Sequence, residues 1–279
     1  MAPLIVTTIQ TNLAWENKAA NLQMLEGKID SLEEKTEVVV LPEMFSTGFS
    51  MNTAMLAETM DGETVEWMKA VAARHKIILI GSLIIKENDR CYNRLVWMLP
   101  NGQFGYYDKR HLFAYGEEDK HYTAGNKRLI ASVKGWRINL QVCYDLRFPV
   151  WARNRLLQTD TPAERVPAIE ETNAVPRPEY DLLIYVANWP ERRSHAWKTL
   201  LCARAIENQC YVVGVNRVGR DGKNINHSGN SLVIDPLGEV LYHMAEEEDI
   251  FTITLQREHL EDVRTKFPFW KDADQFNFR

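Results

Sequence analysis

Three side chains that can cooperate in nucleophilic chemistry stand where predicted strands end. Cys143 directly follows the alternating apolar and polar run 138–142, and Glu43 follows the apolar run 37–41. Lys109 closes a predicted pair of strands. Alternation over a few residues is typical of a half-buried strand. Strand ends in α/β proteins converge on one crevice, so we expect the three groups to share a site.

These residue types suit attack on a carbonyl carbon. A free thiol has a pKa of about 8.5, so only a few per cent is thiolate at neutral pH. It needs a base or a nearby cation to become a useful nucleophile. Glu43 can take the proton, and Lys109 can favour the thiolate and then hydrogen-bond the oxyanion that forms. The backbone N–H of Tyr144 is a natural second oxyanion donor.

Two other interpretations of the cysteine remain open at this point. Cys143 can be an ordinary buried core cysteine. A Cys–His pair is the alternative catalytic arrangement, with His111, His121 and His195 in loop-like stretches as candidates. None of these histidines directly follows a predicted strand, which favours Glu43 as the base.

The bulk composition is that of an ordinary globular protein. The chain has 279 residues, a formal net charge of −5, 45% hydrophobic and 25% charged residues. No basic patch favours nucleic acid or an anionic membrane as a partner. No run of 18 apolar residues predicts a membrane span, and residues 1–8 lack the features of a signal peptide. We therefore expect no nucleic-acid partner, no membrane partner and a cytoplasmic location.

The cysteines give no metal or disulfide pattern. Cys91, Cys143, Cys202 and Cys210 contain no C-x-x-C pair, and no His stands at zinc-finger spacing. Four cysteines can form two disulfides, but Cys202 falls in a predicted helix and Cys210 opens a predicted strand. We expect free thiols, no metal and no organic cofactor.

Strands and helices alternate along the chain. Strands are expected at 4–10, 37–41, 76–85, 138–142, 181–187, 211–216 and 249–255, hairpins at 94–109 and 231–242, helices at 15–32, 64–75, 150–157 and 196–208, and a functional loop at 110–125. We expect one domain over residues 1–279. Within it, the proline-rich segment 158–178 is predicted to be a surface insertion, and 256–279 a polar C-terminal tail.

The two halves of the chain repeat the same order of elements. Strand 38–44 matches 182–191, the helix and strand over 64–85 match those over 196–215, and 93–102 matches 230–238. Two such halves packed sheet on sheet give an α/β fold, a four-layer α-β-β-α sandwich. The alternative, a doubly wound dinucleotide fold, requires G-x-G-x-x-G after the first strand, and the chain has none.

Three motifs around these groups closely resemble the signatures of the nitrilase, or carbon–nitrogen hydrolase, superfamily. They are LPEMF at 41–45, DKRHLF at 108–113 and VCYDLRFP at 142–149, in the family's order and spacing. The resemblance covers about residues 4–255. It implies Glu43 as general base, Lys109 as oxyanion stabiliser and Cys143 as nucleophile. It also implies the α-β-β-α sandwich and a homodimer or larger homo-oligomer.

The same resemblance implies a second catalytic glutamate a few residues before a glycine. Glu118, in GEEDKHYTAG at 116–125, fits best, and the adjacent Glu117 is the alternative. This glutamate is expected to position Lys109 or the substrate.

A further stretch resembles the bacterial ω-amidase branch of the superfamily: NWP at 188–190 with Arg192, His195 and Trp197, then CARAIEN at 202–208. This resemblance implies hydrolysis of the terminal amide of α-keto acid ω-amides, such as α-ketoglutaramate and α-ketosuccinamate, through a thioester. Other amides, N-carbamoyl compounds and nitriles are alternative substrates. A non-catalytic binding protein is the alternative from another class, against which the intact catalytic trio argues.

An ω-amide substrate carries a carboxylate that should meet a cation. Arg192 and Arg193 follow the strand 181–187, and the alternative for both is a solvated charge run. Arg147 is a third candidate, and its alternative is an ion pair with Asp145.

Phe45, Phe113 and Trp189 are the expected apolar walls of the pocket, with simple loop packing as the alternative. The insertion 158–178 is longer than the loop expected in the family and affects only the rim of the pocket.

Overall fold

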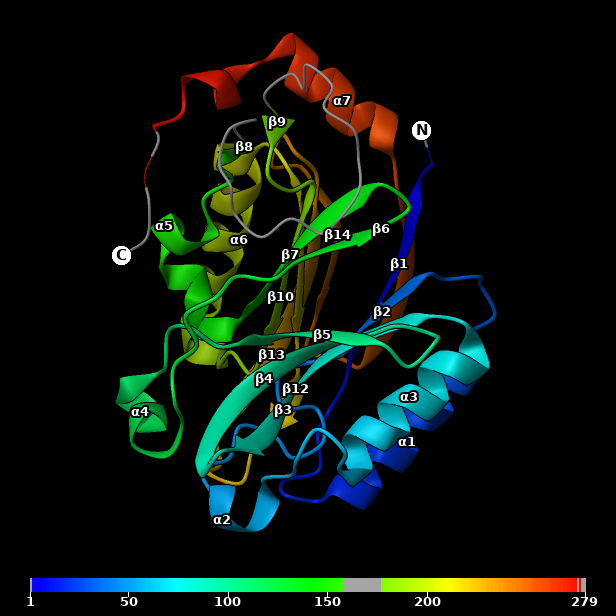
Figure 1. The fold of residues 1–279 in the computed structure, drawn as a ribbon, viewed down its shortest axis with the longest axis vertical. Coiled ribbons are helices and arrows are strands. Elements are labelled where there is room, and N and C mark those ends of the chain that lie inside the picture. Colours follow the sequence, from blue (N-terminus) through cyan, green and yellow to red (C-terminus); the bar gives the residue numbers. More distant parts are fainter. Residues whose placement is uncertain (1, 158–176, 275, 277–279) are drawn as a thin grey trace.

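Two large sheets pack face to face in the computed structural model, which describes residues 2–157, 177–274 and 276 (Figure 1). The six-stranded sheet contains, in spatial order, β15 (Asp249–Leu255), β1 (Leu4–Gln10), β2 (Val38–Val40), β3 (Ile78–Glu87), β4 (Arg90–Met98) and β5 (Phe104–Asp108). The seven-stranded sheet contains β12 (Val218–Arg220), β13 (Asn226–Ile234), β11 (Tyr211–Asn216), β10 (Leu182–Ala187), β7 (Trp136–Val142) and β6 (Ile130–Val133), with β14 (Val240–Ala245) paired to β13.

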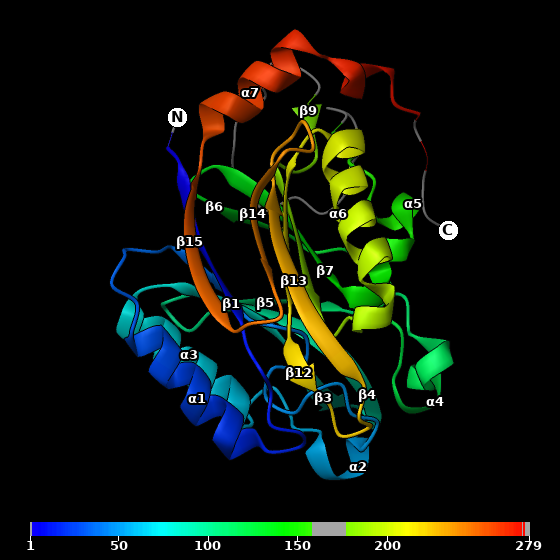
Figure 2. The ribbon, with the colours of Figure 1, turned by 180° about the vertical axis from the view of Figure 1, so that it is seen from behind.

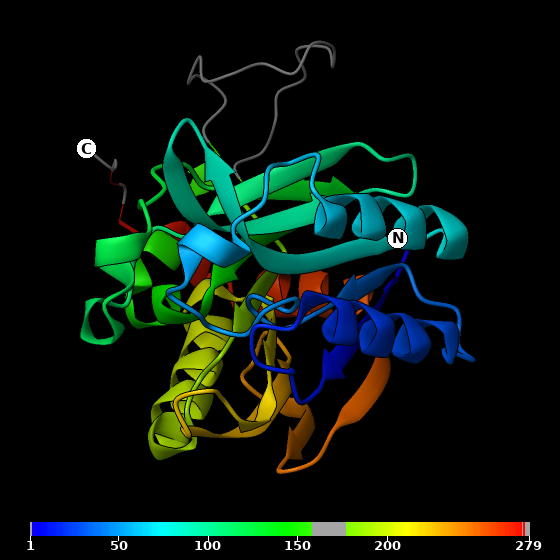
Figure 3. The same ribbon diagram turned by 90° about the horizontal axis from the view of Figure 1, so that it is seen from below.

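Helices cover the outer face of each sheet. Figures 2 and 3 show α1 (Lys18–Asp30) and α3 (Glu63–His75) side by side against the six-stranded sheet, and α6 (Ser194–Asn208) on the opposite side against the seven-stranded sheet. The remaining helices are α2 (Thr53–Leu56), α4 (Glu118–His121), α5 (Pro149–Ala152) and α7 (Arg257–Lys266). In the described part of the chain, no helix is long and apolar enough to cross a membrane.

Three apolar layers separate the four layers of secondary structure. The central layer joins side chains of both sheets, among them Val38 and Ile80 from one and Leu140 and Ile184 from the other. One outer layer lies beneath α1 and α3, and the other lies beneath α6. Because strands such as β2 and β10 are buried on both faces, their sequences are continuous apolar runs. The expected α-β-β-α sandwich is confirmed.

The strand order confirms the internal repeat. In the first sheet β1, β2 and β3 are parallel neighbours, followed by antiparallel β4. In the second sheet β7, β10 and β11 are parallel neighbours, followed by antiparallel β13. The middle strands of these two sets, β2 and β10, are the strands that precede the two matched Pro-Glu turns.

Two sequence expectations about local structure were wrong. The helix expected over 150–157 is only α5, after which Leu156 pairs with Pro178 in a short ladder of β8 (Leu156–Leu157) and β9 (Arg177–Pro178). The chain leaves the helix because Asn154 binds the backbone of Tyr180 through both ends of its amide. The expected insertion at 158–178 lies, apart from its last two residues, outside the described residues.

The segment expected to be a polar C-terminal tail instead contains α7. Arg257 and Arg264 lie two turns apart on its buried face and converge on Asp181, with distances of 3.0 and 2.7 Å between guanidinium nitrogen and carboxylate oxygen. The composition did not predict this helix because two of the side chains on its buried face are arginines. The ion pairs tie the chain's last helix to the start of β10.

Removing the carboxylate at this junction should destabilise the protein strongly. Asp181→Ala leaves buried guanidinium groups without their partner, which typically costs about 3–5 kcal/mol in the free energy of unfolding. Denaturant unfolding followed by circular dichroism measures this change. The matched control is Lys266→Ala, which removes an exposed ion pair with Asp262 on the same helix. We expect little change there, and equal losses in both variants would contradict the assignment.

Candidate active site

Strand ends from both sheets bring the three expected catalytic groups together. Glu43 follows β2, Lys109 follows β5 and Cys143 follows β7. The Lys109 Nζ atom lies 2.9 Å from Glu43 Oε1, and the Cys143 thiol is hydrogen-bonded to the Glu43 side chain. Glu43 and Lys109 are buried, whereas Cys143 is half-buried and borders a cavity.

The structure places Glu118, and not Glu117, against Lys109. Glu118 begins α4 and is fully buried, and its Oε2 and Oε1 lie 2.9 and 3.1 Å from Lys109 Nζ. The Phe113 N–H also donates to Glu118 Oε2, at 2.6 Å. Glu117 is exposed and pairs with Lys120 at 2.6 Å.

Two buried carboxylates therefore share one ammonium group. Burial alone would lower the pKa of Lys109, but the charges of Glu118 and Glu43 outweigh it and raise the pKa above its ordinary value. Burial and the charge of Glu43 raise the pKa of the Cys143 thiol well above its usual range. The resting site thus holds Lys109 as a cation and Cys143 as a neutral thiol.

The donors of Lys109 are fully used in this arrangement. An ammonium group has three N–H donors, and Lys109 makes three contacts, one with Glu43 and two with Glu118. A Lys109 N–H can reach another acceptor only when one of these contacts is released.

Cys143 lies on a sharp backbone turn that Asp145 fixes. The φ angle of Cys143 is +45°, in the left-handed region that non-glycine residues rarely occupy. Asp145 Oδ2 accepts hydrogen bonds from the Val142 N–H at 3.1 Å and the Tyr107 hydroxyl at 2.8 Å. Its Oδ1 accepts from the backbone and ring nitrogens of His111 at 3.0 and 2.8 Å. These contacts hold the Cys143 sulfur at the C-terminal end of β7.

The alternative Cys–His pair does not form. The His111 ring is engaged through Nδ1 with a carboxylate, and His121 and His195 are exposed. The side chain that meets the Cys143 thiol is Glu43.

Two asparagines that sequence reasoning missed orient the carboxylates. Asn93, in β4, donates from Nδ2 to Glu43 Oε1 at 2.8 Å and to Glu118 Oε1 at 3.1 Å. The Asn188 backbone N–H donates to Glu43 Oε2 at 2.8 Å. Asn93 occurs in the repeated stretch 93–102, but nothing in the sequence ties it to a distant glutamate.

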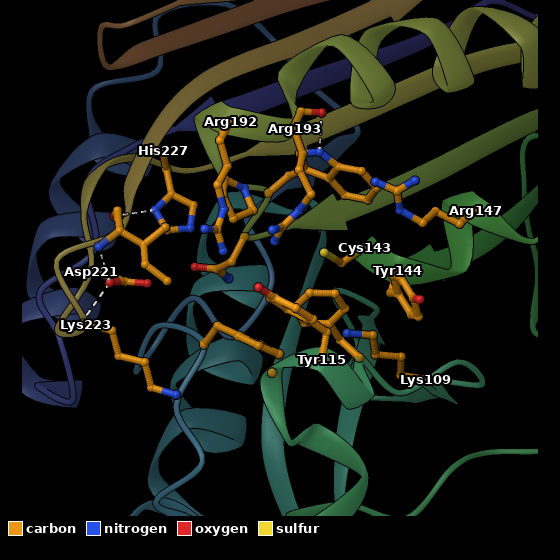
Figure 4. Close-up of a pocket in the computed structure, with 17 residues that line it drawn as sticks. Lys109, Tyr115, Cys143, Tyr144, Arg147, Arg192, Arg193, Asp221, Lys223 and His227 are labelled. Atoms are coloured by element: carbon orange, nitrogen blue, oxygen red, sulfur yellow. Dashed lines mark hydrogen bonds between the residues drawn. The ribbon is translucent and has the colours of Figure 1, made fainter.

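A cavity of about 210 Å³ opens beside Cys143 (Figure 4). This is smaller than the ~300–1,000 Å³ typical of pockets for drug-sized ligands, so it suits a small substrate. Phe113 and Trp189 line it, as expected, and so do Tyr144 and Tyr115.

Three arginines also line this cavity: Arg147, Arg192 and Arg193. The Arg147 guanidinium lies 5.0 Å from the Trp189 ring centroid, and that of Arg193 lies 5.1 Å from the Phe113 ring. Among the residues that the structure describes, none of the three is ion-paired. The ion pair considered between Arg147 and Asp145 is therefore absent.

Phe45 is not a wall of the pocket, contrary to expectation. It is fully buried beneath the six-stranded sheet, 5.8 Å from the Trp67 ring and against Gly81, where an added Cβ would come within 2.5 Å of its ring. The cause is Met44, whose φ of +45° turns the chain directly after the catalytic glutamate. Phe49 lines the cavity instead.

A third group of lining residues comes from the turn between β12 and β13 and from the start of β13, which the sequence did not mark as functional. They are Asp221, Lys223, Ile225 and His227. Figure 4 shows Asp221, Lys223 and His227 on the side of the cavity away from Cys143. The Asp221 carboxylate shapes the turn by accepting from the Lys223 and Ile225 N–H groups at 2.9 Å. Burial, followed by the charge of Arg217, lowers the pKa of His227 to about 4, so this lining histidine is neutral.

Comparison with known proteins gives consistent findings. The family model described as carbon–nitrogen hydrolase matches residues 5–265. Omega-amidase YafV from Escherichia coli K12 is 41% identical over 280 residues, with 99% of each chain covered. The 2-oxoglutaramate amidase from Bacillus subtilis is 30% identical over 270 residues, covering 96% of each. A CN-hydrolase superfamily protein from Xanthomonas campestris, with an arsenic adduct in its active site, has a TM-score of 0.92, 42% identity and full coverage of both chains.

Among the cysteines, we expect Cys143 to be alkylated first by iodoacetamide at neutral pH. It borders the cavity and has Glu43 to accept its proton, whereas Cys210 is fully buried and does not line the cavity. Peptide mapping by mass spectrometry under native conditions measures the order of labelling. Glu43→Gln should slow alkylation at Cys143 and leave labelling of the half-buried Cys202 unchanged. Equal rates at Cys143 in the two proteins would argue against proton transfer to Glu43.

Proposed function

The chain belongs to the carbon–nitrogen hydrolase family, and on that premise we propose that it is an ω-amidase acting on α-keto acid ω-amides such as α-ketoglutaramate and α-ketosuccinamate. The observation that carries this proposal is the thiol of Cys143 beside a buried Glu43–Lys109–Glu118 network. The small cavity next to it is lined by arginines that form no ion pair with any residue the structure describes. The products are the dicarboxylic keto acid and ammonia. The names of the two amidases described above support this substrate class.

The reaction begins with a proton transfer that keeps the charge of the buried network constant. Glu43 and Glu118 carry two negative charges against one positive charge on Lys109. Ionising Cys143 alone would add a further buried negative charge, which its raised pKa disfavours. Moving the thiol proton to Glu43 as the sulfur attacks leaves the total unchanged. Glu43 is therefore the general base.

Attack by Cys143 Sγ forms the C–S bond and moves the carbonyl electron pair onto oxygen. Lys109 and the Tyr144 N–H then stabilise this oxyanion; removing one such donor typically costs about 10²–10³ in rate. The C–N bond breaks as protonated Glu43 gives its proton to the leaving nitrogen, so that ammonia and a thioester result. Glu43 next takes a proton from water, which attacks the thioester, and the acid leaves as the proton returns to sulfur.

Glu118 keeps Lys109 in place throughout. Burial and the charge of Glu43 raise the pKa of Glu118, and Lys109 opposes this rise. The ammonium of Lys109 remains protonated because its own pKa is raised by its two carboxylate partners.

The substrate carboxylate is bound by Arg193 in this proposal. Of the three lining arginines, Arg193 is half-buried, whereas Arg147 and Arg192 are exposed. Burial, followed by the charge of Arg192, lowers the pKa of Arg193, so a negative ligand stabilises its charged form. Cys143 and Arg193 line the same cavity, which supports a position of Arg193 within reach of a substrate attached to the sulfur.

We also propose an assembly state and a cellular compartment. A homodimer or larger homo-oligomer is supported by exposed apolar side chains on neighbouring elements, namely Ile206 of α6 with Val240 and Leu241 of β14. A cytoplasmic location is supported by the four free cysteines, since disulfides persist mainly in oxidising compartments.

Ammonia release should distinguish the substrate classes. We expect turnover of α-ketoglutaramate and α-ketosuccinamate, and little from glutamine, N-carbamoyl amino acids or nitriles. Cys143→Ala should reduce kcat by roughly 10⁴-fold or more, since loss of a nucleophile has effects of that order, with unchanged thermal unfolding. Full activity of this variant would exclude the thioester route, and preferred turnover of an N-carbamoyl compound would replace the proposed substrate.

Arg193→Gln should raise the KM for α-ketoglutaramate by roughly 10- to 100-fold, since a charge-assisted hydrogen bond contributes about 1.5–3 kcal/mol. Steady-state kinetics measure the change. Arg220→Gln is the matched control, because Arg220 is an exposed arginine outside the cavity lining. Arg192→Gln tests in the same way whether the neighbouring cavity arginine binds the substrate carboxylate. An unchanged KM in both cavity variants would remove these arginines from carboxylate binding.

A further inference from the structure

One neutral residue forms hydrogen bonds with both glutamates of the site and with the backbone of Lys109. Asn93 is fully buried in β4. The two N–H donors of its amide are both directed to carboxylates, since Nδ2 lies 2.8 Å from Glu43 Oε1 and 3.1 Å from Glu118 Oε1. Its backbone carbonyl accepts a hydrogen bond from the Lys109 N–H at 3.0 Å. Asn93 thus meets both acids by its side chain and the lysine by its backbone.

This position matters because two carboxylates that accept hydrogen bonds from one nitrogen lie close together. Like charges at such separations raise each other's pKa, and hydrogen bonds to the ionised form lower it. Lys109 offsets the repulsion from one side. Asn93 adds donors to both carboxylates from another side without adding charge.

Asn93 has a second role, which follows from the limited number of N–H donors on the Lys109 ammonium group. All three N–H donors of Lys109 are used by Glu43 and Glu118 in the resting site. To stabilise an oxyanion, Lys109 must release a carboxylate. Glu43 is the one that becomes neutral when it takes the thiol proton, so its bond to Lys109 weakens at that moment. The carboxyl group then needs another contact to remain in place for the next proton transfer.

We propose that Asn93 is a positioning residue that keeps Glu43 ionised in the resting enzyme and holds it in place when Lys109 turns to the oxyanion. This inference rests on the proposed role of Glu43 as general base. The Asn188 backbone N–H donates to Glu43 Oε2 at 2.8 Å. The other oxygen, Glu43 Oε1, accepts from Lys109 and from Asn93. When Lys109 withdraws, the Asn93 amide is the remaining donor at Oε1.

Other charged and titratable groups face the same carboxylates and contribute to their titration. They are Lys109 from the end of β5, Cys143 from the end of β7, and Tyr122 directly after α4. All three remain in a variant changed only at position 93, so a shift in the pH profile reports the lost amide.

The test is Asn93→Leu, which keeps the size of the side chain and removes its donors, together with Asn93→Asp, which keeps its shape and replaces the donor by an acceptor. We expect kcat to fall by up to about 100-fold, the effect of a small misplacement of a catalytic group, with KM little changed. The acidic limb of the kcat profile should move to higher pH, and further for Asn93→Asp, because a carboxylate that loses a donor or gains a like-charged neighbour binds its proton more tightly.

The matched control is Asn139→Leu. Asn139 is a fully buried asparagine of β7, outside the carboxylate network, and its substitution should leave the acidic limb in place. Thermal unfolding identifies variants that fail to fold. A folded Asn93→Leu protein whose acidic limb coincides with that of the wild type, or one altered only in KM, would overturn the proposed role.

The pH dependence of iodoacetamide alkylation at Cys143 gives a readout that does not depend on substrate identity. Its acidic limb should move in the same direction as that of kcat in the two Asn93 variants. If the wild type releases no ammonia from the keto-acid amides, the proposed substrate is wrong, and alkylation still decides the role of Asn93. An unshifted alkylation profile would contradict that role even in an active ω-amidase.

Discussion

The catalytic centre depends on one buried ammonium group that lies between two buried carboxylates. Lys109, Glu43 and Glu118 are removed from water, and buried charges persist only when they are paired and hydrogen-bonded. The three residues belong to separate segments, so their pairing fixes the end of β5, the turn after β2 and the start of α4 relative to one another. The position of the base is therefore set by electrostatics as much as by the strands that lead to it.

The nucleophile is held by a different means. Cys143 has a left-handed backbone conformation, and such strain persists only where the surroundings over-determine it. Asp145 provides that support by accepting hydrogen bonds from the backbone before the cysteine, from Tyr107 of β5, and from His111 in the loop that follows Lys109, here called the lysine loop. The lysine loop and the cysteine turn are consequently tied at a point that takes no part in the chemistry itself.

Sequence reasoning succeeded where a local pattern determines structure. Apolar runs bounded by turns predicted the inner strands and the repeat, and hence the sandwich, because buried strands must be apolar on both faces. The trio of Glu43, Lys109 and Cys143 was predictable because each directly follows such a strand or lies in a short turn after it. Phe45 was misplaced because the left-handed residue before it, Met44, is not marked by its type.

Other features depend on contacts that no local pattern encodes. Asn93 becomes part of the site only through two glutamates distant in sequence, and His227 lines the cavity from the start of β13, where no sequence motif marks it. The helix α7 was missed because its buried face carries Arg257 and Arg264, whose burial depends on Asp181 in another element. Charged residues indicate a solvated segment unless their partner is known.

The turns after β2 and β10 are counterparts in the two halves, and they touch each other: Asn188 donates from its backbone to Glu43 Oε2 at 2.8 Å and from its side chain to the Glu43 carbonyl at 2.5 Å. The two matching turns carry different parts of the site. One copy carries the base, and the other carries the cavity wall with Trp189 and Arg193. Mutation can therefore remodel the wall while the turn that transfers protons stays as it is. A scaffold with two such matching halves can change its substrates without changing its reaction.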